Sequence, residues 1–292
     1  MNPKLDELLI SPRTLSEALL FLKKPSHALI ISGLPGSGKT AVSKALVAAV
    51  LGVQNLENYP YFTVIRRPEG KKDIPIEDIR TVLRSLRLKT TGRGNIRRII
   101  FIEDAHHLST EAQNALLKAL EEPAGDTVFI LSVPSGRAVL PTIASRAARL
   151  SLSPVSLQQA SDYYSAKYQP NVISSAWQLS QGRSGLLSAL LNEEAEHPLK
   201  QAVEAAKRLL GQNSYERLLE LDKTSKDKEQ FGLLLEALDK VLGALERARI
   251  GRGQSPRELL KSRRLVAKLQ SALSANASPR LIALELALNL KT

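Results

Sequence analysis

The chain has 292 residues, of which 43% are hydrophobic and 24% are charged, and these fractions are those of an ordinary globular protein rather than a disordered one. Cysteine is absent, which excludes disulfides, thiol nucleophiles and cysteine-ligated zinc sites. The net charge of +12 is compatible with a polyanionic partner, and the length suggests two or three domains.

The amino terminus and the apolar runs bear on location. Asp6 and Glu7 stand just before a short apolar stretch, which is not the layout of a signal peptide. The longest uninterrupted apolar run, residues 45–51, is far shorter than the roughly 18 residues that a membrane span requires. We therefore expect a cytoplasmic protein without membrane segments.

The first half of the chain alternates strand-like and helix-like patterns. The strand-like runs are rich in β-branched and aromatic residues, as in strands buried on both faces. Thr110 and Gln113 are placed as a capping box for a helix that ends before Pro123. This alternation predicts an α/β fold with a parallel sheet covered by helices. The predicted strands include residues 29–31, 61–65, 99–102 and 128–131.

No strand-like run follows residue 152, so the rest of the chain is predicted to be helical. Residues 154–196 form a small helical unit, with Trp177 expected in its core. We expect three domains: an α/β domain at 1–153, the small helical domain at 154–196 and a helical domain at 197–292. Turns in the last domain are predicted near residues 211–214, 224–227, 251–256 and 275–279.

Residues 33–40 read GLPGSGKT and match the phosphate-binding loop pattern GxxxxGK[ST] between a strand and a helix. Glycines let the backbone approach phosphate oxygens, Lys39 can reach the β and γ phosphates, and Thr40 can ligate Mg²⁺. ATP or ADP with Mg²⁺ is therefore the expected ligand; the alternative is a glycine-rich turn that binds nothing. The expected nucleotide ligands are Gly33, Gly36, Ser37, Gly38, Lys39 and Thr40.

Two acids, Glu103 and Asp104, follow the strand at 99–102. In active ATPases of this general type an Asp for the metal shell precedes a Glu that polarises water, and here the order is reversed. Glu103, with Thr40, is the expected Mg²⁺ ligand, and Asp104 is a weak candidate for a catalytic base. Because a displacement of about 1 Å can cost on the order of a hundredfold in rate, binding should survive this reversal better than hydrolysis. Alternatively, the two acids begin a solvated loop.

A basic stretch runs from Arg80 to Arg98 and contains no acidic residue. Pro75 marks the start of a helix on which Arg80, Arg84 and Arg87 share one exposed side. Such a row suits the phosphates of duplex DNA. The alternative is a solvated helix face or a contact with a neighbouring subunit.

Three further segments, taken together with the phosphate loop, carry a resemblance to a known family. Residues 103–123 read EDAHHLSTEAQNALLKALEEP, residues 140–146 read LPTIASR, and the tail at 269–290 includes SANASPRLIALE. Together with the phosphate loop, and in this order, they resemble bacterial DNA polymerase III clamp-loader subunits, most closely those of the delta-prime type. The resemblance covers essentially the whole chain.

The resemblance implies an AAA+ fold with a five-stranded sheet, a helical lid at 154–196 and a collar at 197–292. In the family the collar assembles subunits of the gamma/tau and delta types around primer-template DNA, and the complex loads the sliding clamp. A delta-prime subunit hydrolyses little ATP and offers an arginine finger to a neighbour. By position that finger is Arg146, although Ala147 stands where the family has cysteine.

Other positions depart from the motor subunits of the family. Val133 stands where a polar residue would sense the γ-phosphate, and Gly185 stands where a lid arginine would contact it, although Arg183 is close enough to substitute. The four-cysteine zinc module is absent, so no zinc is implied. These departures favour the delta-prime type.

Three hypotheses for the function follow. The first is a delta-prime-like clamp-loader subunit that binds ATP or ADP with little or no hydrolysis and supplies Arg146 in trans. The alternative is an active AAA+ motor subunit of the gamma/tau type, or a related helicase-loading ATPase. A third is a free-standing DNA-binding protein. Whether the chain is itself an enzyme stays open at this level.

Overall fold

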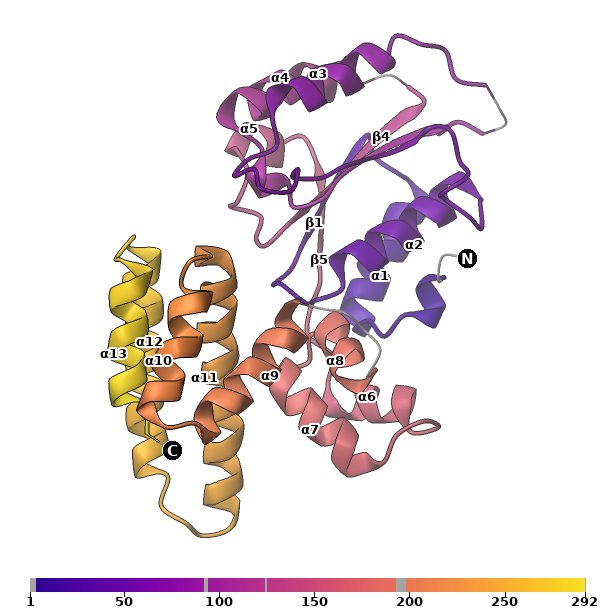
Figure 1. The fold of residues 1–292 in the computed structure, drawn as a ribbon. Coiled ribbons are helices and arrows are strands. Elements are labelled where there is room, and N and C mark those ends of the chain that lie inside the picture. The colour runs from indigo at the N-terminus through magenta and orange to yellow at the C-terminus, as the bar shows by residue number, and fades with distance from the viewer. Residues whose placement is uncertain (1–3, 92–93, 124, 193–197, 292) are drawn as a thin grey trace. The chain divides into compact units, whose positions relative to one another are not determined.

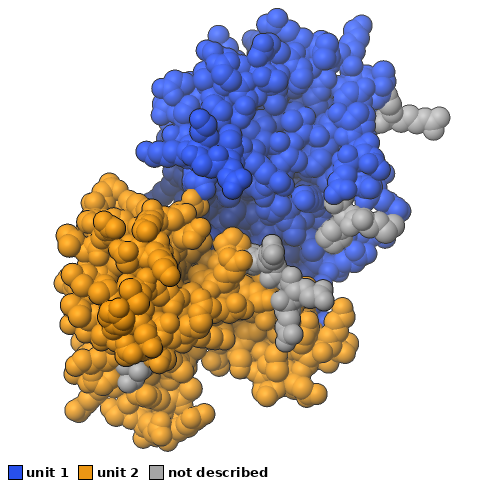
Figure 2. Space-filling model, in the orientation of Figure 1, with its two compact units in different colours: residues 1–163, 182–185 blue, residues 164–181, 186–292 orange. Residues whose placement is uncertain are grey.

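The computed structural model describes residues 4–91, 94–123, 125–192 and 198–291. It contains two compact units, residues 1–163 with 182–185 and residues 164–181 with 186–292 (Figure 2). The expected lid at 154–196 is divided between them, because residues 154–163 and the segment Gly182–Gly185 belong to the first unit. The three-domain division stays a prediction. Within the described ranges, every helix is too short or too polar to cross a lipid bilayer.

The first unit is built on a five-stranded parallel sheet with the order β2-β3-β4-β1-β5, which confirms the α/β fold class. The strands are β1 (Ala28–Ser32), β2 (Phe62–Ile65), β3 (Arg98–Ile102), β4 (Thr127–Val133) and β5 (Ala148–Ser151). The apolar pattern did not indicate β5, whose sequence is ARLS. It is an edge strand that pairs only with β1, so it needs fewer apolar residues than a central strand.

Alternate residues of the central strands point to opposite faces of the sheet, and both faces are buried. Leu29 and Ile31 pack with helices α1 (Pro12–Lys23) and α2 (Lys39–Leu51). Ile30 packs on the other face, with α3 (Ile76–Ser85), α4 (Thr110–Glu121) and the short α5 (Pro141–Ala144). Figure 1 shows these two helical layers. The unit also contains η1 (Leu5–Glu7), η2 (Ala105–His107) and α6 (Leu157–Tyr164).

The cap of α4 differs from the expected capping box. Ser109 is the N-cap and its side chain accepts a hydrogen bond from the amide of Ala112, so the expectation for Thr110 and Gln113 is wrong. Gln113 is buried and bridges two loops: its amide nitrogen donates to the Leu108 carbonyl, and its oxygen accepts from the Leu140 amide at 2.9 Å. It therefore ties the turn after β3 to the start of α5.

The second unit is helical throughout its described residues. Four of the turns that separate its helices lie where the sequence predicts them. Trp177, expected in a core, is only half-buried. The helices are α7 (Pro170–Ser180), α8 (Ser184–Leu191, which begins in the first unit), α9 (Pro198–Gly211), α10 (Ser214–Thr224), α11 (Lys228–Gly251), α12 (Arg257–Ser274) and α13 (Pro279–Asn289).

A buried arginine closes this helical unit. Arg217 of α10 is 7% exposed, and its Nε donates to the Leu209 carbonyl at 2.8 Å. Its Nη1 donates to the carbonyl of Leu290, just beyond α13. One side chain thus satisfies carbonyls at the ends of two helices that are far apart in sequence.

Replacement of Arg217 by alanine should lower the free energy of unfolding of the second unit by about 3 kcal/mol, because buried carbonyls lose their donors. Trp177 is the only tryptophan and lies in this unit, so its fluorescence during urea titration reports the loss. Arg208→Ala is the control, since Arg208 is 61% exposed in its pair with Glu220 and should cost below about 1 kcal/mol. Equal losses in the two variants would contradict the role of Arg217.

Candidate functional site

The loop at residues 33–40 joins β1 to α2, and its backbone needs glycine. Gly36 and Gly38 have φ of 79° and 89°, a region that favours glycine. A Cβ on Gly33 would lie 2.5 Å from the Ser37 hydroxyl oxygen and 3.1 Å from the Leu152 Cβ. Helix α2 begins at Lys39, so its first amides are available at this loop. The loop therefore has the form of an anion cradle.

Lys39 and Thr40 lie beside the acids that follow β3. The Lys39 ammonium donates to the Gly33 carbonyl at 2.9 Å. Burial lowers the pKa of Lys39, and the negative charges of Asp104 and Glu103 act against that lowering. The Thr40 hydroxyl donates to Glu103 Oε1. The parallel sheet thus brings the two sequence motifs together, as expected.

Each acid has further partners that the sequence alone did not indicate. Arg66, just after β2, pairs with Glu103, with Nε and Oε2 2.6 Å apart. The Asp104 amide donates to the Ser132 hydroxyl at 2.8 Å, and Asp104 has a φ of 49°. Val133 is fully buried, so the polar group at the end of β4 nearest the acids is Ser132. Arg66 could have been suspected only with the strand order known, because β2 lies next to β3.

These residues fit a nucleotide with Mg²⁺. The cradle supplies amides and an ammonium for phosphates, and the oxygens of Thr40 and Glu103 are the hard ligands that Mg²⁺ prefers. In the part of the chain that the structure describes, no cluster of three or more His, Asp or Glu could hold a metal by itself. Mg²⁺ in proteins usually keeps several waters and is bound by one or two protein oxygens together with substrate phosphates, which accords with Thr40 and Glu103.

The segment Gly182–Gly185 belongs to the same unit as the loop and contacts it. Arg183 is 3% exposed and its Nη1 donates to the Pro35 carbonyl at 2.8 Å. The Ser184 hydroxyl donates to the Ser37 carbonyl at 3.0 Å. A Cβ on Gly185 would lie 2.9 Å from the Gly36 carbonyl oxygen, so no larger side chain fits there in this arrangement.

Arg146 lies just after α5, and its contacts are local. Its Nη1 donates to the Thr142 carbonyl at 2.9 Å, and its Nη2 pairs with Glu121 Oε1 at 2.8 Å. None of its partners among the described residues belongs to the loop at 33–40. The Arg146 side chain is 36% exposed, so its guanidinium is accessible to solvent. Glu121 was not singled out from the sequence.

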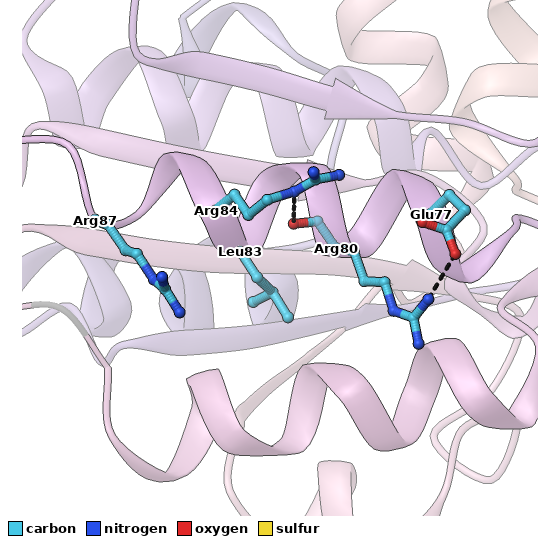
Figure 3. Close-up of a pocket in the computed structure, with 5 residues that line it drawn as sticks. All are labelled: Glu77, Arg80, Leu83, Arg84 and Arg87. Carbon is cyan, nitrogen blue, oxygen red and sulfur yellow. Dashed lines mark hydrogen bonds and ion pairs between the residues drawn. The ribbon is translucent and has the colours of Figure 1, made fainter.

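The three arginines of α3 and its end line one shallow hollow on the surface (Figure 3). Arg80 pairs with Glu77, with Nη1 and Oε1 2.7 Å apart, and Arg84 Nε donates to the Arg80 carbonyl at 3.4 Å. Arg80, Arg84 and Arg87 are all exposed, as the helical spacing predicts. Glu77 offsets part of the positive charge at one end of the row.

Comparison with known proteins finds relatives among the subunits of DNA polymerase III. A family model described as "DNA polymerase III, delta subunit" matches residues 14–156. A delta-prime subunit of DNA polymerase III from Pseudomonas aeruginosa is 29% identical over 207 residues, which are 64% of this chain and 62% of that protein. A tau subunit from Bacillus subtilis is 32% identical over 161 residues, which are 50% of this chain and 28% of that protein. The matched stretch thus spans less than two thirds of either relative.

A solved structure supports the fold. The DNA polymerase III gamma-subunit-related protein of Thermotoga maritima aligns with a TM-score of 0.56 at 20% identity, covering 94% of this chain and 97% of that one. Its parallel α/β architecture is that of the first unit described above. Residues 14–156 of the chain therefore resemble the DNA polymerase III delta subunit family, and its relatives include delta-prime and tau subunits of DNA polymerase III.

Proposed function

We propose that the chain is a delta-prime-like clamp-loader subunit that binds ATP or ADP with little hydrolysis and supplies Arg146 to a neighbour's nucleotide. The observation that carries this proposal is the engagement of Glu103, whose two carboxylate oxygens are taken by Thr40 and Arg66. Glu103 is the expected Mg²⁺ ligand, and a carboxylate held on both sides must give up a partner before it can hold the metal for hydrolysis. Asp104 is one methylene shorter than the glutamate that active ATPases use at this position.

Phosphate binding would rest on the loop, and of the two acids only Glu103 would contribute, through Mg²⁺. Amides of residues 36–40 and the Lys39 ammonium would hold the phosphates, and Thr40 with Glu103 would hold Mg²⁺. When bound, Mg²⁺ neutralises phosphate charge. Burial lowers the pKa of Lys39, whereas the negative charges of Asp104 and Glu103 favour its ammonium form, the form that suits a phosphate ligand.

Arg146 suits a role in trans because its ion pair is exposed. The side chains of Arg146 and Glu121 are 36% and 48% exposed, so their pair contributes below about 1 kcal/mol and can be exchanged for a phosphate. A guanidinium is always charged and can form two parallel hydrogen bonds to phosphate oxygens. This combination supports an arginine finger.

The proposed partners follow from the family. They are clamp-loader subunits of the gamma/tau and delta types, with the sliding clamp reached through the assembled complex. Residues 197–292 would act as the collar. The arginines of α3 would contact the phosphates of primer-template DNA, and a cytoplasmic location accords with this role.

The intact loop favours a second candidate, an active motor subunit. Lys39 and Thr40 are both present, and these residues serve nucleotide hydrolysis as well as binding. Turnover by the purified chain distinguishes the two proposals.

The first prediction from the proposed function concerns nucleotide binding. Lys39→Ala should abolish binding of a fluorescent ADP analogue, because the ammonium that meets the phosphates is lost. The unmodified chain should bind the analogue and hydrolyse ATP slowly or not at all. Lys44→Ala, on the same helix, is the control and should bind normally. Rapid ATP hydrolysis by the purified chain that is lost in Lys39→Ala would contradict the delta-prime-like proposal and support the motor-subunit candidate.

The second prediction concerns Arg146. An arginine finger contributes about a thousandfold or more to phosphoryl transfer, although one finger among several sites lowers the total rate less. Arg146→Ala should leave assembly and this chain's own nucleotide affinity unchanged and lower the ATPase rate of a reconstituted clamp-loader complex. Arg146→Lys should restore little of the ATPase rate, because an ammonium cannot form the two parallel hydrogen bonds that a guanidinium makes to phosphate oxygens. Arg137→Ala is the control. An unmodified rate with Arg146→Ala contradicts the finger.

The third prediction concerns the α3 arginines. Reversal of Arg84 and Arg87 to Glu should weaken primer-template binding by the complex and reduce the slope of log K against log salt by about 2, since two phosphate contacts are lost. The same reversal at Arg247 and Arg252 changes net charge equally and should have a smaller effect. If assembly fails and DNA affinity is unchanged, the row is a subunit interface.

A further inference from the structure

We propose that the segment Gly182–Gly185 is a built-in competitor for the nucleotide site, which a nucleotide must displace in order to bind. This inference rests on the proposed nucleotide binding and adds its regulation. The segment and the loop at 33–40 belong to one compact unit. The competing contact is therefore internal to this unit.

Two side chains hold the segment on the loop. Arg183 donates to the Pro35 carbonyl at 2.8 Å and Ser184 donates to the Ser37 carbonyl at 3.0 Å. Arg183 is almost completely buried, so its contact is shielded from water. Both bonds end on main-chain oxygens of the loop itself, and they therefore fix the segment to the part of the chain that would cradle phosphate.

The backbone of the segment comes closest to the loop at 33–40 at Gly185. A Cβ on Gly185 would lie 2.9 Å from the Gly36 carbonyl oxygen, 3.0 Å from the Gly38 amide nitrogen and 3.1 Å from the Gly38 Cα. The amides of this loop are the groups that bind phosphate oxygens. The backbone of the segment at Gly185 thus packs closely against Gly36 and Gly38 of the loop.

The other groups that a nucleotide would use also have partners inside the chain. Lys39 donates to the Gly33 carbonyl, and the Thr40 hydroxyl donates to Glu103. Glu103 is in turn paired with Arg66. A nucleotide must exchange these contacts for its own, so the site is satisfied in its absence.

A second glycine fixes where the segment begins. Gly182 has a φ of +74°, and a Cβ there would lie 2.4 Å from the Val155 carbonyl oxygen. The Val155 amide donates to the Gly182 carbonyl at 2.8 Å. The turn into the segment is therefore anchored, and the docked position is defined by backbone contacts at both ends.

Gly185→Ala tests the inference. Residue 185 lies in the first turn of α8, where alanine is more favourable than glycine, so the helix should not be weakened. The added methyl would meet loop backbone, which cannot yield as a flexible side chain would, and should lift the segment. Gly211→Ala is the matched control, because residue 211 ends α9 and a Cβ there meets nothing within 4 Å.

Two measurements use the full chain. Without nucleotide, amide hydrogen exchange should accelerate in peptides covering 33–40 and 182–185 in Gly185→Ala and not in the control. A ribose-labelled fluorescent ADP with Mg²⁺ should bind Gly185→Ala more tightly, on the order of tenfold, because binding no longer has to break the two hydrogen bonds that hold the segment on the loop. Ser184→Ala, which removes one of them, should show a smaller gain in the same direction.

The outcomes separate this inference from the proposed function. Faster exchange with tighter ADP binding, abolished by adding Lys39→Ala, supports the competition. Faster exchange with unchanged or weaker ADP binding overturns it, since the segment would then dock without competing. Unchanged exchange overturns it as well. Failure of both the unmodified chain and Gly185→Ala to bind ADP overturns the inference and the nucleotide proposal, whereas the role of Arg146 is read separately from Arg146→Ala in the complex.

Discussion

Because β1, β3 and β4 pair in parallel, their carboxyl ends lie at the same end of the sheet, and the candidate site depends on this constraint. The loop at 33–40 follows β1 at that end of the sheet, and Glu103 follows β3 beside it. The strands are central and buried on both faces, so their positions are held by packing from two helical layers. The site is therefore built on buried strands that are packed on both faces.

At this end of the sheet, Lys39 and Glu103 both have polar or oppositely charged partners within the chain. Lys39 meets Gly33, Thr40 and Arg66 share Glu103, and the Asp104 amide meets Ser132. A site that is satisfied internally binds a ligand by exchange, so its affinity reflects a difference between two sets of contacts. For a subunit proposed to contribute structure and one arginine to an assembly, weak or conditional nucleotide binding is sufficient.

Arg146 illustrates the limit of reading roles from sequence. Its position after residues 140–145 was evident from the motif, and the structure adds that Glu121 and Thr142 hold the guanidinium. Those partners come from α4 and α5, and α4 also anchors the start of α5 through Gln113. The expectation of a capping box at Thr110 and Gln113 failed because the sequence cannot tell a capping side chain from a buried one that bridges loops.

The sequence by itself determined the α/β class, the four apolar strands, the helical second half with its turns, and the loop at 33–40. These are local signals, set by periodicity, glycine and proline positions, and a contiguous motif. Tertiary structure alone decided the edge strand β5, the pairing of Arg66 with Glu103, and the docking of Gly182–Gly185 on the loop. Each of these joins segments distant in sequence, and their approach follows from strand order and backbone clearance, which leave no periodic trace in a single sequence.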